Sequence, residues 1–304
     1  MTWGQKVYEN YSPYELSNSE ISGAAGRVTS LNDDPPLRFQ RCNGAGVLSC
    51  RLDGRSTVPQ DIFQQGSLKF RFPSVGPDAP LEAVIVNLGG GLTGGDELTF
   101  SATVRPEAQA VLTTQACEKI YRSLGTPAIV KATLDVGDKG QLEWLGQPTI
   151  VFDGGRLRRK TDVTLSASAV FLGIEAFIFG REAMGESVCH GDLNDCWEIR
   201  RDGILVHTDT FAVKDNVSET LGHPAALGAN RAMATLRYVA ADAEQRLDEL
   251  RDLLKDFPGV AAASAWNGML IARFAARDGY DLTKGIHHVL GGFRRSRMPA
   301  VWSI

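Results

Sequence analysis

Acidic side chains beside apolar segments are the residues of this 304-residue chain that are best suited to chemistry. Four of them stand in or next to β-type runs, namely Asp96, Glu143, Asp153 and Glu175. Glu175 lies inside the apolar run 171–179, where burial of a carboxylate is unfavourable unless it is paired, hydrated or lining a cavity. Two such carboxylates facing one substrate could act as a glycosidase-type acid and base. The alternative for Glu175 is a solvent-facing position or a structural ion pair with an arginine.

Basic side chains close to apolar segments could neutralise these acids. Lys119 and Arg122 lie three residues apart, and Arg181 precedes Glu186 by five residues. Ordinary surface ion pairs are the alternative reading, and such pairs contribute little to stability. These residues are therefore candidates for a polar site only if the fold brings them to the acids.

Cysteine and histidine residues do not form a tight metal motif in this chain. Cys189-His190 and Cys196 offer soft ligands, but the C-x-x-C pairs of structural zinc sites are missing. His287 and His288 are adjacent on an expected helix and so point in different directions. The chain has five cysteines, and an odd number argues against a disulfide framework. We expect no tightly bound cofactor.

A glycine-rich stretch, GGGLTGGD at 89–96, follows an apolar β-type run. Glycine permits positive φ and close backbone approach, so such a loop could cradle phosphates. However, neither a Lys-Ser/Thr pair nor a clear helix follows it, as nucleotide-binding motifs require. Residues 97–100 alternate like another strand. The pattern favours a tight connection between two strands over phosphate binding.

Short β-type runs separated by Gly, Pro, Asp and Ser extend over residues 25–240, which predicts a mainly β protein. The segments 104–115, 136–147 and 165–176 resemble one another and start 32 and then 29 residues apart. Such a period is typical of stacked β units, as in a β-solenoid. Chance similarity between short turn-strand pieces is the alternative, and the sequence leaves both open.

Two helices are expected near the C-terminus, at about 242–257 and 281–297. Asp242, followed by Gln245, resembles a capping box for the first helix. Asp281 is a plausible N-cap for the second helix, and three arginines follow at its end. Between the helices, two β-type runs meet at Asn267-Gly268, a dipeptide typical of a hairpin turn.

The second of these helices has an apolar stripe that could serve either the core or a partner protein. The stripe consists of Leu282, Ile286, Val289 and Leu290.

Composition excludes several classes of partner. The formal net charge is -4 and the sequence pI is about 5.8, which argues against a nucleic-acid or anionic-membrane partner. No apolar run reaches the roughly 20 residues that a membrane span needs, and the N-terminus lacks the pattern of a secretory signal. We expect a cytoplasmic protein with a loosely ordered lead-in at residues 1–24 and a single β-rich domain at residues 25–304.

Several segments, taken together and in order, resemble the UreD (UreH) family of urease accessory proteins. They are VNLGGGLTGGD (86–96), LTTQACEKIYRS (112–123), LEWLGQPTIVFDGGRLRR (142–159), GIEAFIFGREAMGE (173–186), SAWNGMLIAR (264–273) and the terminal PAVW (299–302). The resemblance covers most of residues 37–304.

The resemblance implies a mostly β fold with two helices and a non-catalytic role in urease maturation. Members of the family join UreF and the GTPase UreG to apo-urease, and family models route Ni2+ through internal channels towards the urease active site. Nickel would accordingly be cargo in transit. A transit route needs weak ligands, so scattered carboxylates suit it better than a Cys/His cage.

By the matching motifs, six polar residues are expected to line or shape a hydrated passage. They are Asp96, Lys119, Asp153, Glu175, Arg181 and Glu186. The alternative function is a hydrolase on a β-solenoid-like scaffold, with Asp153 and Glu175 as its acid and base.

Overall fold

The computed structural model describes residues 41–76, 78–181 and 185–302. Its seven-stranded sheet, sheet A, has the order β14-β13-β11-β8-β5-β1-β2. The strands of sheet A are β1 (Asn43–Asp53), β2 (Ser56–Gly66), β5 (Glu97–Val104), β8 (Ala128–Val136), β11 (Gly155–Leu165), β13 (His190–Arg201) and β14 (Ile204–Asn216).

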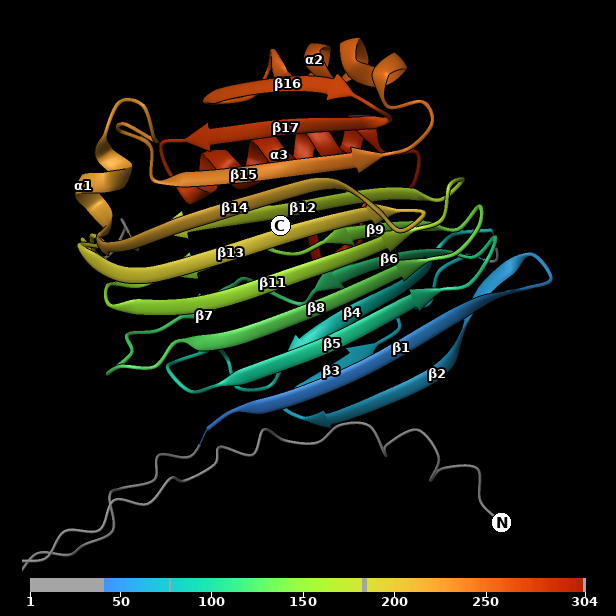
Figure 1. Ribbon diagram of the computed structural model, residues 1–304, viewed down its shortest axis with the longest axis horizontal. Helices are drawn as coiled ribbons and strands as arrows, with labels where there is room; N and C mark the ends of the chain where they lie inside the picture. Colours follow the sequence, from blue (N-terminus) through green and yellow to red (C-terminus); the bar gives the residue numbers. More distant parts are fainter. Residues whose placement is uncertain (1–40, 77, 182–184, 303–304) are drawn as a thin grey trace, which may run out of the picture. The chain divides into compact units, whose positions relative to one another are not determined.

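The second sheet, sheet B, has the order β16-β17-β15-β12-β9-β6-β4-β3, with the short strand β10 beside β12 and the short strand β7 beside β10. Its strands are β3 (Leu68–Arg71), β4 (Leu81–Asn87), β6 (Gln109–Thr114), β7 (Glu118–Ile120), β9 (Gln141–Leu145), β10 (Thr149–Val151), β12 (Val170–Phe179), β15 (Ala232–Val239), β16 (Val260–Trp266) and β17 (Met269–Ala276). Figure 1 shows the two sheets as facing layers, with sheet A in front.

The chain alternates between the two sheets and stacks successive units in parallel. Strand β5 pairs in parallel with β8, and β8 with β11, while β6, β9 and β12 form the matching parallel ladder in sheet B. Val104, Val136 and Leu165 are Cα partners in sheet A, as Gln109, Gln141 and Val170 are in sheet B. The spacings of 32 and 29 residues are thus the lengths of successive solenoid coils, so the predicted repeat and the mainly β fold class are confirmed.

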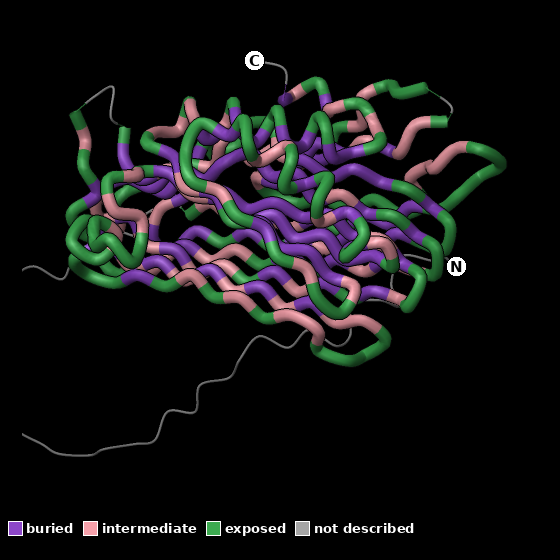
Figure 2. Tube along the Cα trace, turned by 90° about the horizontal axis from the view of Figure 1, so that it is seen from above, coloured by how far each residue is buried: buried purple, intermediate pink, exposed green. Residues whose placement is uncertain are grey.

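Apolar side chains fill the space between the sheets. Phe100 of sheet A stacks on Trp144 of sheet B with ring centroids 5.1 Å apart, and Phe171 meets Trp197 at 6.5 Å. Buried residues run through the inner strands in Figure 2, while exposed residues gather at the turns and edges. A parallel sheet is stable when both of its faces are covered, and here α3 covers part of the outer face of sheet B.

The helical segments are short. They are α1 (Val217–Gly222), the 3-10 turn η2 (Glu244–Arg246), α2 (Leu247–Leu254), α3 (Gly279–Phe293) and the 3-10 turn η3 (Ala300–Trp302). The two C-terminal helices are confirmed, but α1 was not foreseen. The hairpin at Asn267-Gly268 is confirmed, because β16 and β17 pair antiparallel and both turn residues have positive φ.

The predicted starts of the two C-terminal helices are wrong. Asp242 does not cap α2; its carboxylate accepts from the Tyr238 hydroxyl at 2.7 Å and pairs with Arg295. The N-cap of α3 is Asp278, whose side chain accepts from the Asp281 N–H at 2.8 Å.

The ends of these helices and the apolar stripe also differ from expectation. Helix α2 ends at Leu254 and α3 at Phe293, because Arg294 adopts extended backbone and its side chain turns to Glu143 at 2.6 Å. The whole apolar stripe of α3 is buried in the core, so the idea that it offers a partner surface is wrong. The predicted lead-in at residues 1–24 lies outside the described residues and stays a prediction, as does the start of the domain at residue 25.

The glycine-rich loop connects β4 of sheet B to β5 of sheet A, as predicted. Gly90, Gly91 and Gly95 have φ values of +69°, +149° and +85°, which residues with a side chain rarely adopt. A Cβ on Gly94 would lie 2.0 Å from the Ser123 Oγ, so the loop also packs too closely for a larger residue. Local backbone geometry therefore explains the glycines.

Candidate functional site

A cavity of about 510 Å³ lies between the two sheets. Its inner wall comes from sheet A and includes Val130, Ala132, Leu157, Arg159 and Thr161. Exposed residues at the loop after β6 also line it, so the cavity reaches the surface there. They are Gln115 and Ala116, together with Lys119 of β7 and Gly90 of the glycine-rich loop.

The mouth of this cavity is a break in sheet B. One coil is interrupted between β6 and β7 and the next between β9 and β10, at residues 115–117 and 146–148. Pro148 cannot donate a ladder hydrogen bond, and the N–H of Gln147 bonds instead to the Thr114 Oγ1 at 2.8 Å. The third coil, β12, runs unbroken across the same level, and its pairing places Glu175 opposite the break.

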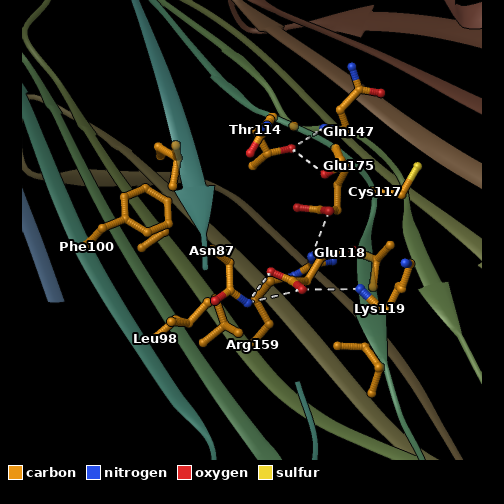
Figure 3. Close-up of a pocket in the computed structure, with 18 of the residues that line it drawn as sticks. Asn87, Leu98, Phe100, Thr114, Cys117, Glu118, Lys119, Gln147, Arg159 and Glu175 are labelled. Carbon is orange, nitrogen blue, oxygen red and sulfur yellow. Dashed lines mark hydrogen bonds and ion pairs between the residues drawn. The ribbon is translucent and has the colours of Figure 1, made fainter. Parts of the chain in front are cut away.

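Arg159 and Glu175 form the charged centre of the cavity. The Arg159 Nη1 lies 2.8 Å from the Glu175 Oε1 and donates to the Thr149 Oγ1 at 3.1 Å, while its Nε donates to the Asp195 Oδ1 at 2.7 Å. All three charged side chains are almost completely buried. Figure 3 shows the Glu175 carboxylate directed towards Arg159, with Glu118 on the other side of the guanidinium.

The protonation of this centre is set mainly by burial. Desolvation raises the pKa of Glu175 to about 7, although Arg159 opposes the shift. Desolvation alone would lower the pKa of Arg159, but Asp195 and then Glu175 raise it above its ordinary value. The Arg159 guanidinium is thus held between two buried carboxylates, and burial favours the neutral form of one of them, Glu175.

Glu118 is a further acid near the mouth. Burial raises the pKa of Glu118, against the hydrogen bond that the Asn87 Nδ2 donates to its Oε2 at 3.1 Å. Lys119 is exposed beside it, so both charge signs meet at the entrance.

A second, smaller cavity of about 70 Å³ shares Glu175 with the first. Asp195, Asp209, Arg237 and Arg273 also line it. Asp209 pairs with Arg237 at 2.9 Å and with Arg273 at 3.0 Å. The Arg237 side chain is 4% exposed and that of Arg273 is 62% exposed, so this chain of charges leads from the interior to a different part of the surface.

Two of the six predicted residues, Lys119 and Glu175, line the larger cavity together. The remaining four line neither of these two cavities. Asp96 accepts hydrogen bonds from the N–H groups of Cys42 and Thr93, both at 2.8 Å, and so holds the end of the glycine-rich loop.

The other predicted residues serve local structure. Arg181 pairs with Glu186 at 2.8 Å and lies 4.4 Å over the ring of Phe152. Asp153 accepts from the N–H groups of Cys189 and His190, both at 2.9 Å, and from the Arg122 Nη2 at 2.8 Å. The role of Cys189 and His190 that the structure shows is therefore contact with Asp153 through their backbone.

The hydrolase alternative is not favoured. Strands β10 and β12 pair in parallel from Thr149–Phe177 to Val151–Phe179. Glu175 precedes this paired stretch by two residues, and Asp153 follows it by two residues, so they lie beyond its opposite ends. That separation is roughly 15–20 Å along the strands, against about 5–9.5 Å for glycosidase carboxylates.

Sequence reasoning missed Arg159 and Asp195, which hold the centre of the site. Each breaks the polar alternation of its strand by carrying a charge on the buried face of sheet A. Arg159 of β11 and Asp195 of β13 are Cα partners in adjacent coils. Opposite charges on the buried faces of two successive strands were therefore the sequence signal for this ion pair.

Replacing Asp153 with asparagine is expected to lower the free energy of unfolding by about 1–2 kcal/mol at pH 7. The hydrogen bond from His190, with Arg122 and Cys189, lowers the pKa of Asp153. A lowered carboxyl pKa stabilises the fold above the unfolded pKa, and this stabilisation is lost as the pH falls through the folded pKa. Urea unfolding should therefore show the difference at pH 7 but not in strong acid. The exposed Asp248→Asn variant is the control, and an equal effect there would contradict the prediction.

Within the described part of the chain, no three His, Cys, Asp or Glu side chains are grouped as a metal site would require. Nor does any described helix have the length and apolar character to cross a bilayer. The fold and the cavities together define a parallel β-solenoid protein with a charged interior that reaches the surface.

Comparison with known proteins gives the family. Residues 43–303 match the family model described as UreD urease accessory protein. The urease accessory protein UreD of Mesorhizobium japonicum is 42% identical, over 89% of this chain and 96% of its own. The UreD protein of Agrobacterium fabrum is 37% identical, over 95% of this chain and 99% of its own. The UreD protein of Xanthobacter autotrophicus is 42% identical, over 87% of this chain and 91% of its own. The chain belongs to the UreD family of urease accessory proteins, which confirms the resemblance.

Proposed function

We propose that this protein is a urease maturation factor that makes and breaks no covalent bond itself. It acts in the cytoplasm as a scaffold that joins UreF and, through UreF, the GTPase UreG to apo-urease. It also routes Ni2+ through its interior towards the urease active site, with nickel as cargo. Membership of the family supports the role in urease maturation.

The observation that carries the nickel route is the pair of cavities that share Glu175 as a lining residue. The larger one opens at the break in sheet B, and the smaller one leads by way of Asp209 to the exposed Arg273. Carboxylate and hydroxyl oxygens line most of the way, and the Cys117 thiol lies at the mouth. Hard oxygen ligands bind first-row divalent ions less tightly than thiolate or imidazole groups do. Conduction requires binding that is favourable enough for entry but weak enough for release.

A tryptophan at the cavity mouth tests this proposal. Ala116 is exposed and lines the mouth, so Ala116→Trp should fill the entrance without crowding the core. In a strain lacking the native protein, at limiting nickel, we expect the variant to yield urease with roughly tenfold less nickel than the parent, because ions cannot pass the blocked entrance. Co-purification with UreF and UreG should be unchanged. The measurements are the metal content of purified urease and the recovery of both partners.

Ala226→Trp is the matched control, since Ala226 is also exposed but lines neither interior cavity. A normal nickel content of urease from the Ala116→Trp strain would contradict the interior route and leave only the scaffold role. Normal urease activation in a deletion strain at limiting nickel would sink both roles.

A further inference from the structure

The guanidinium of Arg159 lies in the larger cavity, bonded to side chains that also line the smaller one. Arg159 lines the larger cavity, and Asp195, to which it is bonded, lines the smaller one. Glu175, its other partner, lines both. Glu175 is thus a wall common to both cavities, and the Arg159 guanidinium lies 2.8 Å from its carboxylate.

The bonding of Arg159 differs from that of a fully satisfied structural arginine. Its Nη1 and Nε are bonded, but its Nη2 is buried with no hydrogen-bond partner among the described residues. The guanidinium also lies 4.8 Å over the ring of Phe177, which guides its plane without a hydrogen bond. The larger cavity provides empty space beside it into which the side chain can turn.

Charge balance gives the guanidinium a second effect. Asp195 and Glu175 converge on one cation, and their oxygens lie 2.7 and 2.8 Å from its nitrogens. Two buried carboxylates without that charge would attract a divalent ion strongly, because few water molecules compete there. Arg159 thus occupies the position in which such an ion would be held.

We propose that Arg159 is the gate of the interior route, a positioning residue that neutralises Glu175 and Asp195 and gives way to a passing divalent cation by turning into the larger cavity. This inference rests on the proposed nickel route. The gate keeps the two carboxylates from becoming a trap in which nickel stays bound.

Equilibrium dialysis of the full-length protein against Ni2+ alone, without a histidine tag, tests the gate. We expect Arg159→Ala to retain about one nickel ion per chain at micromolar nickel, because carboxylates bind divalent first-row ions once their counter-ion is gone. The parent should retain at least tenfold less, and Glu175→Gln with Asp195→Asn in the alanine background should abolish the retention. Arg159→Gln, which preserves more of the packing, should behave like the alanine variant.

Two matched variants control for charge and for burial. Arg159→Lys keeps a positive charge and should retain no more nickel than the parent. Arg246→Ala removes an arginine of similar exposure, 10% against 11%, that pairs with Glu249 and lines neither of the two cavities. It should also retain no more nickel than the parent.

The results separate the gate from the proposed function. If the folded alanine and glutamine variants retain no nickel, or the lysine variant retains as much as they do, the gate is overturned, even if Ala116→Trp blocks nickel delivery. If Arg159→Ala and Arg159→Gln retain nickel and Ala116→Trp leaves the nickel content of urease unchanged, the result supports Arg159 as the residue that keeps nickel from binding to the two carboxylates. The proposed delivery route would then be wrong.

Discussion

Replacing Trp302 with alanine should lower the free energy of unfolding by about 3–5 kcal/mol. The side chain is 2% exposed and packs in the core cluster that sheet B forms with α3. Its Nε1 donates to the Thr113 Oγ1 at 3.1 Å and to the Leu145 carbonyl at 3.2 Å, at the edge of the break in sheet B. Removal leaves a cavity, and each acceptor loses one hydrogen bond, although the Thr113 Oγ1 still donates to the Leu145 carbonyl at 2.6 Å. Urea unfolding followed by circular dichroism measures the change.

Trp302→Phe separates packing from hydrogen bonding. It keeps most of the buried ring but loses the donor, so we expect a loss of about 1–2 kcal/mol. The exposed Trp266→Ala variant is the control for loss of an indole ring at the surface. A decrease in the free energy of unfolding below about 1 kcal/mol for Trp302→Ala would show that the η3 segment does not stabilise sheet B.

Replacing Glu175 with glutamine should make the protein more stable relative to the parent as the pH rises. Burial raises the pKa of Glu175 from 4.5 to about 7. A carboxyl group with a raised folded pKa stabilises the fold fully below the unfolded pKa, and that stabilisation is lost as the pH rises through the folded pKa. The parent therefore loses stability that the glutamine variant, which does not titrate, retains.

The expected size follows from the shift. At about 1.36 kcal/mol per pKa unit, the variant should gain about 2–3 kcal/mol on the parent between pH 5 and pH 8. The measurement is urea unfolding of both proteins at the two pH values. Glu198→Gln, on the outer face of sheet A, is the control and should show a much smaller change between the two pH values. A difference between Glu175→Gln and the parent that is the same at both pH values would contradict the raised pKa.

The stacking of the coils could be predicted because it depends on local pattern. Val104, Val136 and Leu165 recur at the start of similar turn-strand pieces, and in a solenoid each coil lies on the preceding one in the same register. The hairpin at Asn267-Gly268 was predictable for the same reason, since two residues with positive φ fix the turn and the turn fixes the pairing.

The centre of the site could not be predicted because it depends on pairs that only the stacking brings together. Arg159 and Asp195 are 36 residues apart, and their contact needs the parallel register of β11 and β13. The predictions of the helix starts were wrong for a related reason. Asp242 has the pattern of a cap, but Arg295 and the Tyr238 hydroxyl take its oxygens once the chain is folded.

The parallel ladders have a mechanical consequence for the interior. Each coil of sheet A is hydrogen-bonded to the coils before and after it along nearly its whole length, as β8 is to β5 and β11. Within each wall, neighbouring coils consequently cannot part without breaking a row of backbone bonds, so each wall is stiff. Side-chain rotamers are then the most readily changed part of the space between the walls. Rotamer changes take picoseconds to nanoseconds when side chains are free and longer when they are packed, whereas domain opening takes microseconds to milliseconds. Traffic through such an interior would proceed in a stiff frame, at a pace set by single side chains.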